Sequence, residues 1–142
     1  RDGGLRARVV SGGAGEDFAR VAGEEDGDTL MTANNYANLL EELNRYEEAK
    51  ELVRNTMPVA RRVLGESHEI TLRMRSIYAT ALRRDPNATL DDLREAVTTY
   101  EETERTSRRV LGGAHPTTTG IEKCLGEARA VLRARETLPM SA

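Results

Sequence analysis

Apolar and small residues recur along the chain with the three- and four-residue spacing of helices that bury one face. Between about Asp28 and Leu43 these positions are Leu30, Ala33, Tyr36, Ala37, Leu40 and Leu43, which predicts one helix. After a break at Asn44-Arg45, a second helix is predicted from about Tyr46 to Leu64, with Ala49, Leu52, Val53, Thr56, Val59, Ala60, Val63 and Leu64 on its inner face. Gly65 is expected to end it, because glycine tolerates the left-handed conformation common after a helix.

The same plan follows a second time. A helix is predicted from about Glu69 to Arg83, with Leu72, Ile77, Tyr78, Ala79 and Leu82 as its inner positions. Asp85-Pro86-Asn87 is expected to turn the chain, and Thr89 begins a capping-box-like "TLDD". The helix that follows is predicted to reach about Leu111, carrying Leu93, Ala96, Val97, Tyr100, Thr103 and Val110. A last helix is predicted from His115-Pro116 to about Glu136.

The links between these helix pairs are themselves repeated. "RRVLGESHEITL" at 61–72 returns as "RRVLGGAHPTTT" at 108–119, and "GEEDGDTL" at 23–30 anticipates "GESHEITL" at 65–72. The interpretation is a Gly-rich flexible segment at 1–15, a helical repeat domain at 16–136 and a tail at 137–142. The domain divides into a truncated repeat at 16–26, repeats at 27–68 and 69–115, and a capping helix at 116–136. In that last helix the pattern weakens at Gly120 and Gly126, and Arg129 falls where Leu40 and Leu82 lie, as suits the polar end of a solenoid.

Composition narrows the function classes. The 142 residues allow one domain, and charged residues of both signs make up 32% with a net charge of -3, which argues against a nucleic-acid-binding surface. No apolar run approaches the roughly 18 residues of a membrane span. The single cysteine excludes an internal disulfide. The sequence starts at Arg1 rather than Met, which leaves the upstream repeat count open; we expect a cytoplasmic protein, or alternatively the soluble face of a larger organellar complex.

Catalytic, metal and cofactor chemistry have no motif behind them. His68 and His115 begin helices without a second His or Cys at ligand spacing, so no metal is expected. Cys124 is expected to pack in the core, and "SGGAGED" at 11–17 lacks the Lys-Ser/Thr of a phosphate loop. Pro58 is expected to bend its helix. We therefore expect no catalytic residues, no cofactor and no enzyme activity.

Charged pairs are expected on the outer face of the predicted 89–111 helix. Glu101 with Arg105, and Glu104 with Arg108, are four residues apart, and such pairs contribute about 0.3 kcal/mol each on a solvated helix.

The segment "TLMTANNYANLLEELNRYEEAKEL" at 29–52 resembles the tetratricopeptide repeat, in its longer kinesin-light-chain-like form. The resemblance lies in the Thr-Leu start, the Asn35-Tyr36-Ala37 step, Leu40, the Arg45-Tyr46 turn and Glu48-Ala49, and in the Leu-Gly…His links. It implies an all-α fold, a right-handed α-solenoid of stacked antiparallel helix pairs. The small residues Ala37, Ala79, Ala49 and Ala96 would lie where the helices of a pair approach closely.

A tetratricopeptide solenoid has a concave surface formed by the first helix of each pair, and the resemblance places the partner-binding residues there. They are Met31, Asn34, Asn35, Asn38 and Glu41 in the first copy, and Arg73, Ser76, Thr80 and Arg83 in the second. Asparagine offers both donor and acceptor, so a row of them can pair with a ligand main chain; the alternative is that they cap or are merely solvated. The lysines of a chaperone-tail carboxylate clamp are not evident.

The function implied is a non-catalytic adaptor that binds a partner peptide or helix in this groove. The alternative is a structural linker subunit held permanently in a larger multi-subunit assembly, such as an algal photosynthetic complex, because a truncated repeat leaves an apolar face uncovered.

Overall fold

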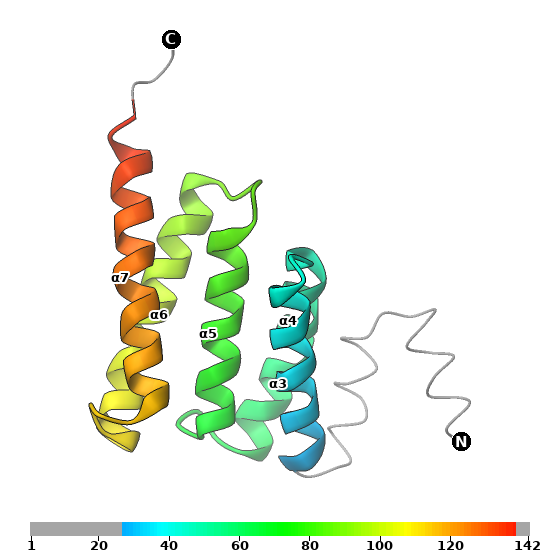
Figure 1. The fold of residues 1–142 in the computed structure, drawn as a ribbon. Coiled ribbons are helices and arrows are strands. Elements are labelled where there is room, and N and C mark those ends of the chain that lie inside the picture. The colour runs from blue at the N-terminus through cyan, green and yellow to red at the C-terminus, as the bar shows by residue number, and fades with distance from the viewer. Residues whose placement is uncertain (1–26, 139–142) are drawn as a thin grey trace.

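Five helices make up the part of the chain that the computed structural model describes, residues 27–138. They are α3 (Gly27–Glu42), α4 (Tyr46–Val63), α5 (Glu69–Arg84), α6 (Leu90–Leu111) and α7 (Pro116–Glu136). Each consecutive pair is in contact, and α5 also contacts both α3 and α7. Figure 1 shows the result as two layers, with α3, α5 and α7 side by side in front and α4 and α6 behind them. The predicted all-α solenoid of stacked helix pairs is confirmed.

Local signals set the helix ends close to the predicted positions. Asn44 adopts φ 63° in the turn between α3 and α4, and Gly65 adopts φ 101° after α4. Thr89 closes a complete capping box at the start of α6, because its hydroxyl accepts from the Asp92 N–H while the Asp92 carboxylate accepts from the Thr89 N–H. The first helices of the successive units start at Gly27, Glu69 and Pro116.

Two apolar clusters fill the space between the layers. The first joins α3, α4 and α5 around residues such as Leu30, Leu52 and Met74. The second joins α5, α6 and α7 around Leu82, Tyr100 and Leu125. Because α5 contributes to both clusters, each hairpin completes the apolar cover of the next, which is how a helical repeat gains stability.

Alanines occupy the close approaches between helices. Ala37, Ala49, Ala79 and Ala96 are all buried, as expected for positions where a larger side chain would not fit.

Three residues assigned to inner faces are exposed instead. The assignments of Leu43, Val63 and Val110 to the core were wrong, and the three side chains lie at or beyond the C-terminal ends of α3, α4 and α6. The helical spacing is correct there, but the neighbouring helix no longer covers the last turn.

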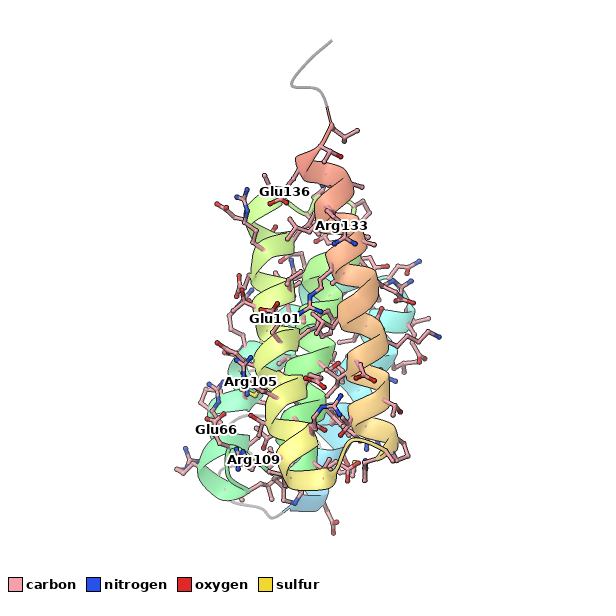
Figure 2. All side chains as sticks on the ribbon, turned by 90° about the vertical axis from the view of Figure 1, so that its left-hand side faces the viewer. Glu66, Glu101, Arg105, Arg109, Arg133 and Glu136 are labelled. Carbon is pink, nitrogen blue, oxygen red and sulfur yellow. The ribbon has the colours of Figure 1, made fainter. Side chains whose placement is uncertain are left out.

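One of the two predicted ion pairs on α6 forms and the other does not. Arg108 binds Glu104 at 2.7 Å, as predicted. Glu101 is instead bound by Arg129 of α7 at 2.9 Å, so the expected pair with Arg105 is wrong. Figure 2 shows the charged outer surface of α6 and α7 on which Glu101 and Arg105 lie. Arg129, which the sequence places at a core position of the repeat, thus serves a polar contact at the end of the stack.

The expectations for residues 1–26 and 139–142 lie outside the described residues. These are the Gly-rich segment, the truncated first repeat, the "SGGAGED" stretch and most of the tail.

Candidate functional site: a groove across the first helices

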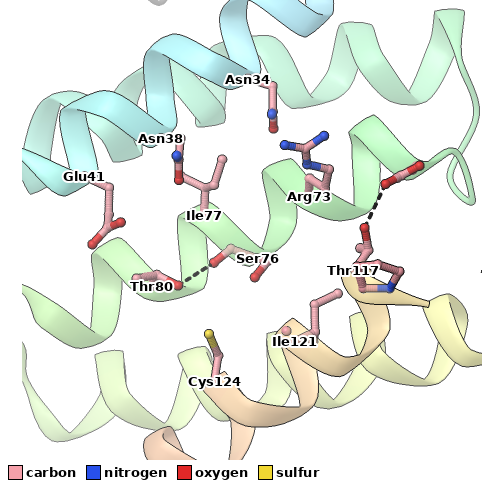
Figure 3. A pocket seen from close by; sticks show the side chains of 13 residues that line it. Asn34, Asn38, Glu41, Arg73, Ser76, Ile77, Thr80, Thr117, Ile121 and Cys124 are labelled. Atoms are coloured by element: carbon pink, nitrogen blue, oxygen red, sulfur yellow. Dashed lines mark hydrogen bonds between the residues drawn. The ribbon is translucent and has the colours of Figure 1, made fainter. Parts of the chain in front are cut away.

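A groove of about 560 Å³ crosses the front layer of the stack, and residues of α3, α5 and α7 line it. Asn34, Asn38 and Glu41 come from α3; Glu69, Arg73, Ser76, Ile77 and Thr80 come from α5; Pro116, Thr117, Gly120, Ile121 and Cys124 come from α7. Figure 3 shows these side chains converging from the three helices. The groove therefore spans both hairpins and α7 rather than belonging to one hairpin.

The floor of the groove is apolar and its walls are polar. Ile77 and Ile121 are buried there, while Cys124 is half-buried and packs against the second apolar cluster. Gly120 carries no side chain on the α7 wall, and a Cβ built there would meet no atom within 4 Å, so this part of the wall is open.

Two of the three carboxyl and guanidinium groups that line the groove are already engaged. Glu41 is buried and forms an ion pair with Arg84. Glu69 accepts a 2.8 Å hydrogen bond from the hydroxyl of Thr117. Arg73 is exposed and makes no hydrogen bond or ion pair with another described residue. The guanidinium of Arg73 is therefore the charge available to a ligand.

Asn34 is the most unusual polar residue of the site. Its side chain is 1% exposed, yet neither its Oδ1 nor its Nδ2 has a hydrogen-bond partner among the described residues. In Figure 3 its carboxamide points across the groove toward the guanidinium of Arg73. A buried polar group without a partner costs about 1–3 kcal/mol, so a ligand that satisfied it would regain that free energy.

At the other end of the groove, α5 and α6 share a buried polar contact. The hydroxyls of Thr80 and Tyr100 form a short hydrogen bond, and Tyr100 is completely buried. Burial raises the pKa of Tyr100 to about 12, although the hydrogen bond with Thr80 opposes that shift. Nearby, Arg83 lies 3.6 Å from Glu127 of α7.

The structure brings six of the nine predicted partner-binding residues into this groove. Asn34, Asn38, Glu41, Arg73, Ser76 and Thr80 line it, whereas Met31, Asn35 and Arg83 do not. Asn34 and Glu41 are buried although the resemblance placed them on a partner-binding surface, and Met31 packs against the first apolar cluster. Neighbouring α5 covers this side of α3, which the sequence of one repeat cannot show.

Asn35 lies on a different side of α3. It is exposed, and its repeat equivalents Ile77 and Cys124 sit on sides of α5 and α7 that pack toward the preceding hairpin. Asn35 thus offers a natural comparison for Asn34 and Asn38.

The α7 wall was missed by the sequence reasoning. The signal that could have found it is the repeat spacing. Gly120 lies 47 positions after Arg73, and Cys124 lies 47 positions after Ile77, so both are the α7 equivalents of groove residues on α5. No group of three or more His, Cys, Asp or Glu residues in the described chain could hold a metal ion.

This arrangement defines a class: a helical repeat protein whose stacked hairpins present a shared groove. Residues 29–69 match the family model of the tetratricopeptide repeat. This match supports a tetratricopeptide repeat over the α3–α4 hairpin and the joint that follows it. No curated protein and no solved structure matches it. Within residues 27–138, no helix is long and apolar enough to cross a membrane.

Proposed function

We propose that the chain is a non-catalytic adaptor that holds an extended segment of a partner protein in the groove across α3, α5 and α7. Tetratricopeptide repeats typically serve as interaction modules, which supports a protein partner. The observation that carries the proposal is the buried, unpartnered carboxamide of Asn34 beside an unpaired Arg73.

The recognition follows from the donors and acceptors of these side chains. A peptide group presents one N–H and one C=O, and the carboxamide of Asn34 can satisfy both. Asn38 now donates to Glu42 at 3.2 Å on the exposed rim, a contact that a ligand can replace at little cost. Arg73 binds an acceptor on the partner, and Ile77 and Ile121 receive an apolar side chain between them.

The repeat spacing supports the longer kinesin-light-chain-like form of the family. Successive first helices begin at Gly27 and Glu69, and then at Pro116. These intervals of 42 and 47 residues exceed the 34 of the common tetratricopeptide repeat. The excess before α7 coincides with the Asp85–Ala88 turn and the long α6.

Affinity capture with three versions of the chain tests the proposal. Wild type and Asn35→Ala are expected to retain the same partners, whereas Asn34→Ala/Asn38→Ala loses them. Removing the unpartnered Asn34 carboxamide leaves no new buried polar group, so thermal melting should show the double variant folded. Equal partner sets for all three proteins would refute groove binding.

A second candidate function, that of a linker subunit in a permanent assembly, is favoured by one feature. Leu39 and Leu43 of the α3 region are 49% and 56% exposed. In that case Leu39→Arg/Leu43→Arg would release the partners while Asn34→Ala/Asn38→Ala kept them.

The compartment proposed is the cytoplasm, and the mixed surface charge supports protein rather than nucleic-acid partners.

A further inference from the structure

Two of the helices that line the groove begin with a histidine as the N-cap residue. The Nδ1 atom of His68 accepts a hydrogen bond from the Ile70 N–H at 3.1 Å. The Nδ1 atom of His115 accepts from the Thr117 N–H at 3.0 Å. N-caps are usually Ser, Thr, Asp or Asn, as Thr89 is for α6. At α5 and α7 the acceptor is instead a nitrogen that can be protonated.

Protonation reverses the role of that nitrogen. Neutral imidazole has one acceptor nitrogen, whereas in the imidazolium both nitrogens carry a proton and act only as donors. The protonated ring therefore loses the bond to the backbone N–H. It also places a positive charge at the positive end of the helix dipole, which is unfavourable. Both effects weaken the first turn of the helix.

Around His68 the charged residues are engaged elsewhere. Glu66, in the same joint, binds Arg61 at 2.9 Å and lies 3.8 Å from Arg75. Glu69, the first residue of α5, accepts from Thr117 of α7. Arg73 follows one turn later on α5. None of the carboxylates in residues 27–138 forms an ion pair with the His68 ring.

The surroundings of His115 are similar. Arg108 of α6 binds Glu122 of α7 at 2.5 Å and Glu104 at 2.7 Å, so both carboxylates are already paired. Glu69 approaches from α5 but accepts the Thr117 hydroxyl. Across the described chain no carboxylate pairs with the His115 ring either.

The two caps are linked to each other at one end of the groove. Thr117 donates its N–H to His115 and its hydroxyl to Glu69, and Glu69 begins the helix that His68 caps. Both Glu69 and Thr117 line the groove. A change in either cap therefore reaches the contact that joins the first turns of α5 and α7.

We infer that His68 and His115 form a pH switch in the joints between the repeats. Near neutral pH both rings cap their helices, and Thr117 and Glu69 join the first turns of α7 and α5. When mild acid protonates the rings, both caps open and the groove loses affinity for its partner. The loss of partner affinity rests on the proposed function, whereas the opening of the caps does not.

The sequence makes the test unusually clean, because the chain has two histidines and both are these caps. Imidazole is the side chain whose charge ordinarily responds to mild acid, so these two rings are the groups that the measurement addresses. His68→Asn/His115→Asn is the matched control, since asparagine keeps an acceptor oxygen both at neutral pH and in mild acid.

The first measurement needs no ligand. From pH 7.5 to 5.5 the wild type should melt about 5 °C lower, and amide exchange at Ile70 and Thr117 should accelerate several-fold. The double Asn variant should change by a small fraction of that. An equal response in both proteins, or no response in the wild type, overturns the switch.

The second measurement uses a peptide recovered by random-peptide display on this chain. Its affinity for the wild type should fall at least several-fold at pH 5.5 while its affinity for the Asn variant holds. If the exchange rates respond but the affinity does not, control of the groove by the caps is refuted. If no peptide binds at any pH, the groove function fails while the exchange data still decide whether the caps switch.

Discussion

The hydroxyl of Thr117 donates a 2.8 Å hydrogen bond to the carboxylate of Glu69, and so ties the first turn of α7 to the first turn of α5. These residues lie 48 positions apart, at the starts of successive repeats. The bond therefore links two walls of the groove directly. Since the acceptor is a carboxylate, this bond is charge-assisted and stronger than one between two neutral groups.

Thr117→Val should therefore weaken both the fold and the groove. The substitution keeps the side-chain shape but leaves Glu69 without its donor, and a loss of about 1–2 kcal/mol in the free energy of unfolding is expected from denaturant titration. Thr117→Ser, which restores a hydroxyl, should recover most of it. Equal losses for the two variants would show that the hydrogen bond contributes nothing.

Replacing either exposed glycine of α7 by alanine should stabilise the chain. Gly120 and Gly126 lie in the helix interior with open space where a Cβ would stand. Alanine reduces the entropy lost on folding, so each change is expected to add about 0.5–1 kcal/mol. A lower melting temperature for Gly126→Ala would indicate a contact that the structure does not contain.

Enlarging the alanines between helices should have the opposite effect. Ala37→Leu and Ala49→Leu insert a branched side chain at fully enclosed positions, which typically costs about 1–3 kcal/mol. Ala130→Leu, at an exposed position of α7, is the matched control and should be nearly neutral. Thermal melting that is unchanged for both core variants would disprove the close packing of α3 on α4.

Tyr100 should make the fold sensitive to alkali. Burial raises its pKa to about 12 from the usual value near 10, so the fold favours the neutral phenol. The stability that this shift contributes is complete below about pH 10 and is lost as the pH rises toward 12, by up to about 2–3 kcal/mol. Tyr100→Phe gives up the bond to Thr80 at neutral pH but should show less loss between about pH 9 and 11. Parallel stability curves for the two proteins would contradict the assignment.

Much of the fold could be predicted because each joint is marked locally. Gly65 and Asn44 adopt the left-handed conformation, and Thr89 and the two histidines begin helices, so the boundaries are set within a few residues of sequence. Packing that depends on neighbouring repeats could not be predicted as well from the sequence. The exposure of Val63 and Val110 depends on where an adjacent helix ends, and the apolar periodicity of one helix does not predict the length of its neighbour.

The groove was predicted in outline and missed in its chemistry. The sequence pointed to the row of asparagines on α3, but the burial of Asn34 arises from the way α5 covers α3. The α7 wall escaped prediction because Gly120 carries no side chain to suggest a site. Likewise Glu101 binds Arg129 of the next helix, a choice of partner that spacing within α6 could not reveal.

Random-peptide display against three versions of the chain tests the central claim most directly. Gly120→Trp places a large ring in the groove, whereas Gly126→Trp places the same ring on the same helix outside it, and both positions have open space for a side chain. Peptides selected on the wild type should bind Gly126→Trp equally well and lose at least tenfold in affinity for Gly120→Trp. Peptides that bind all three proteins alike, or a selection that yields none, would contradict a groove built to hold a partner.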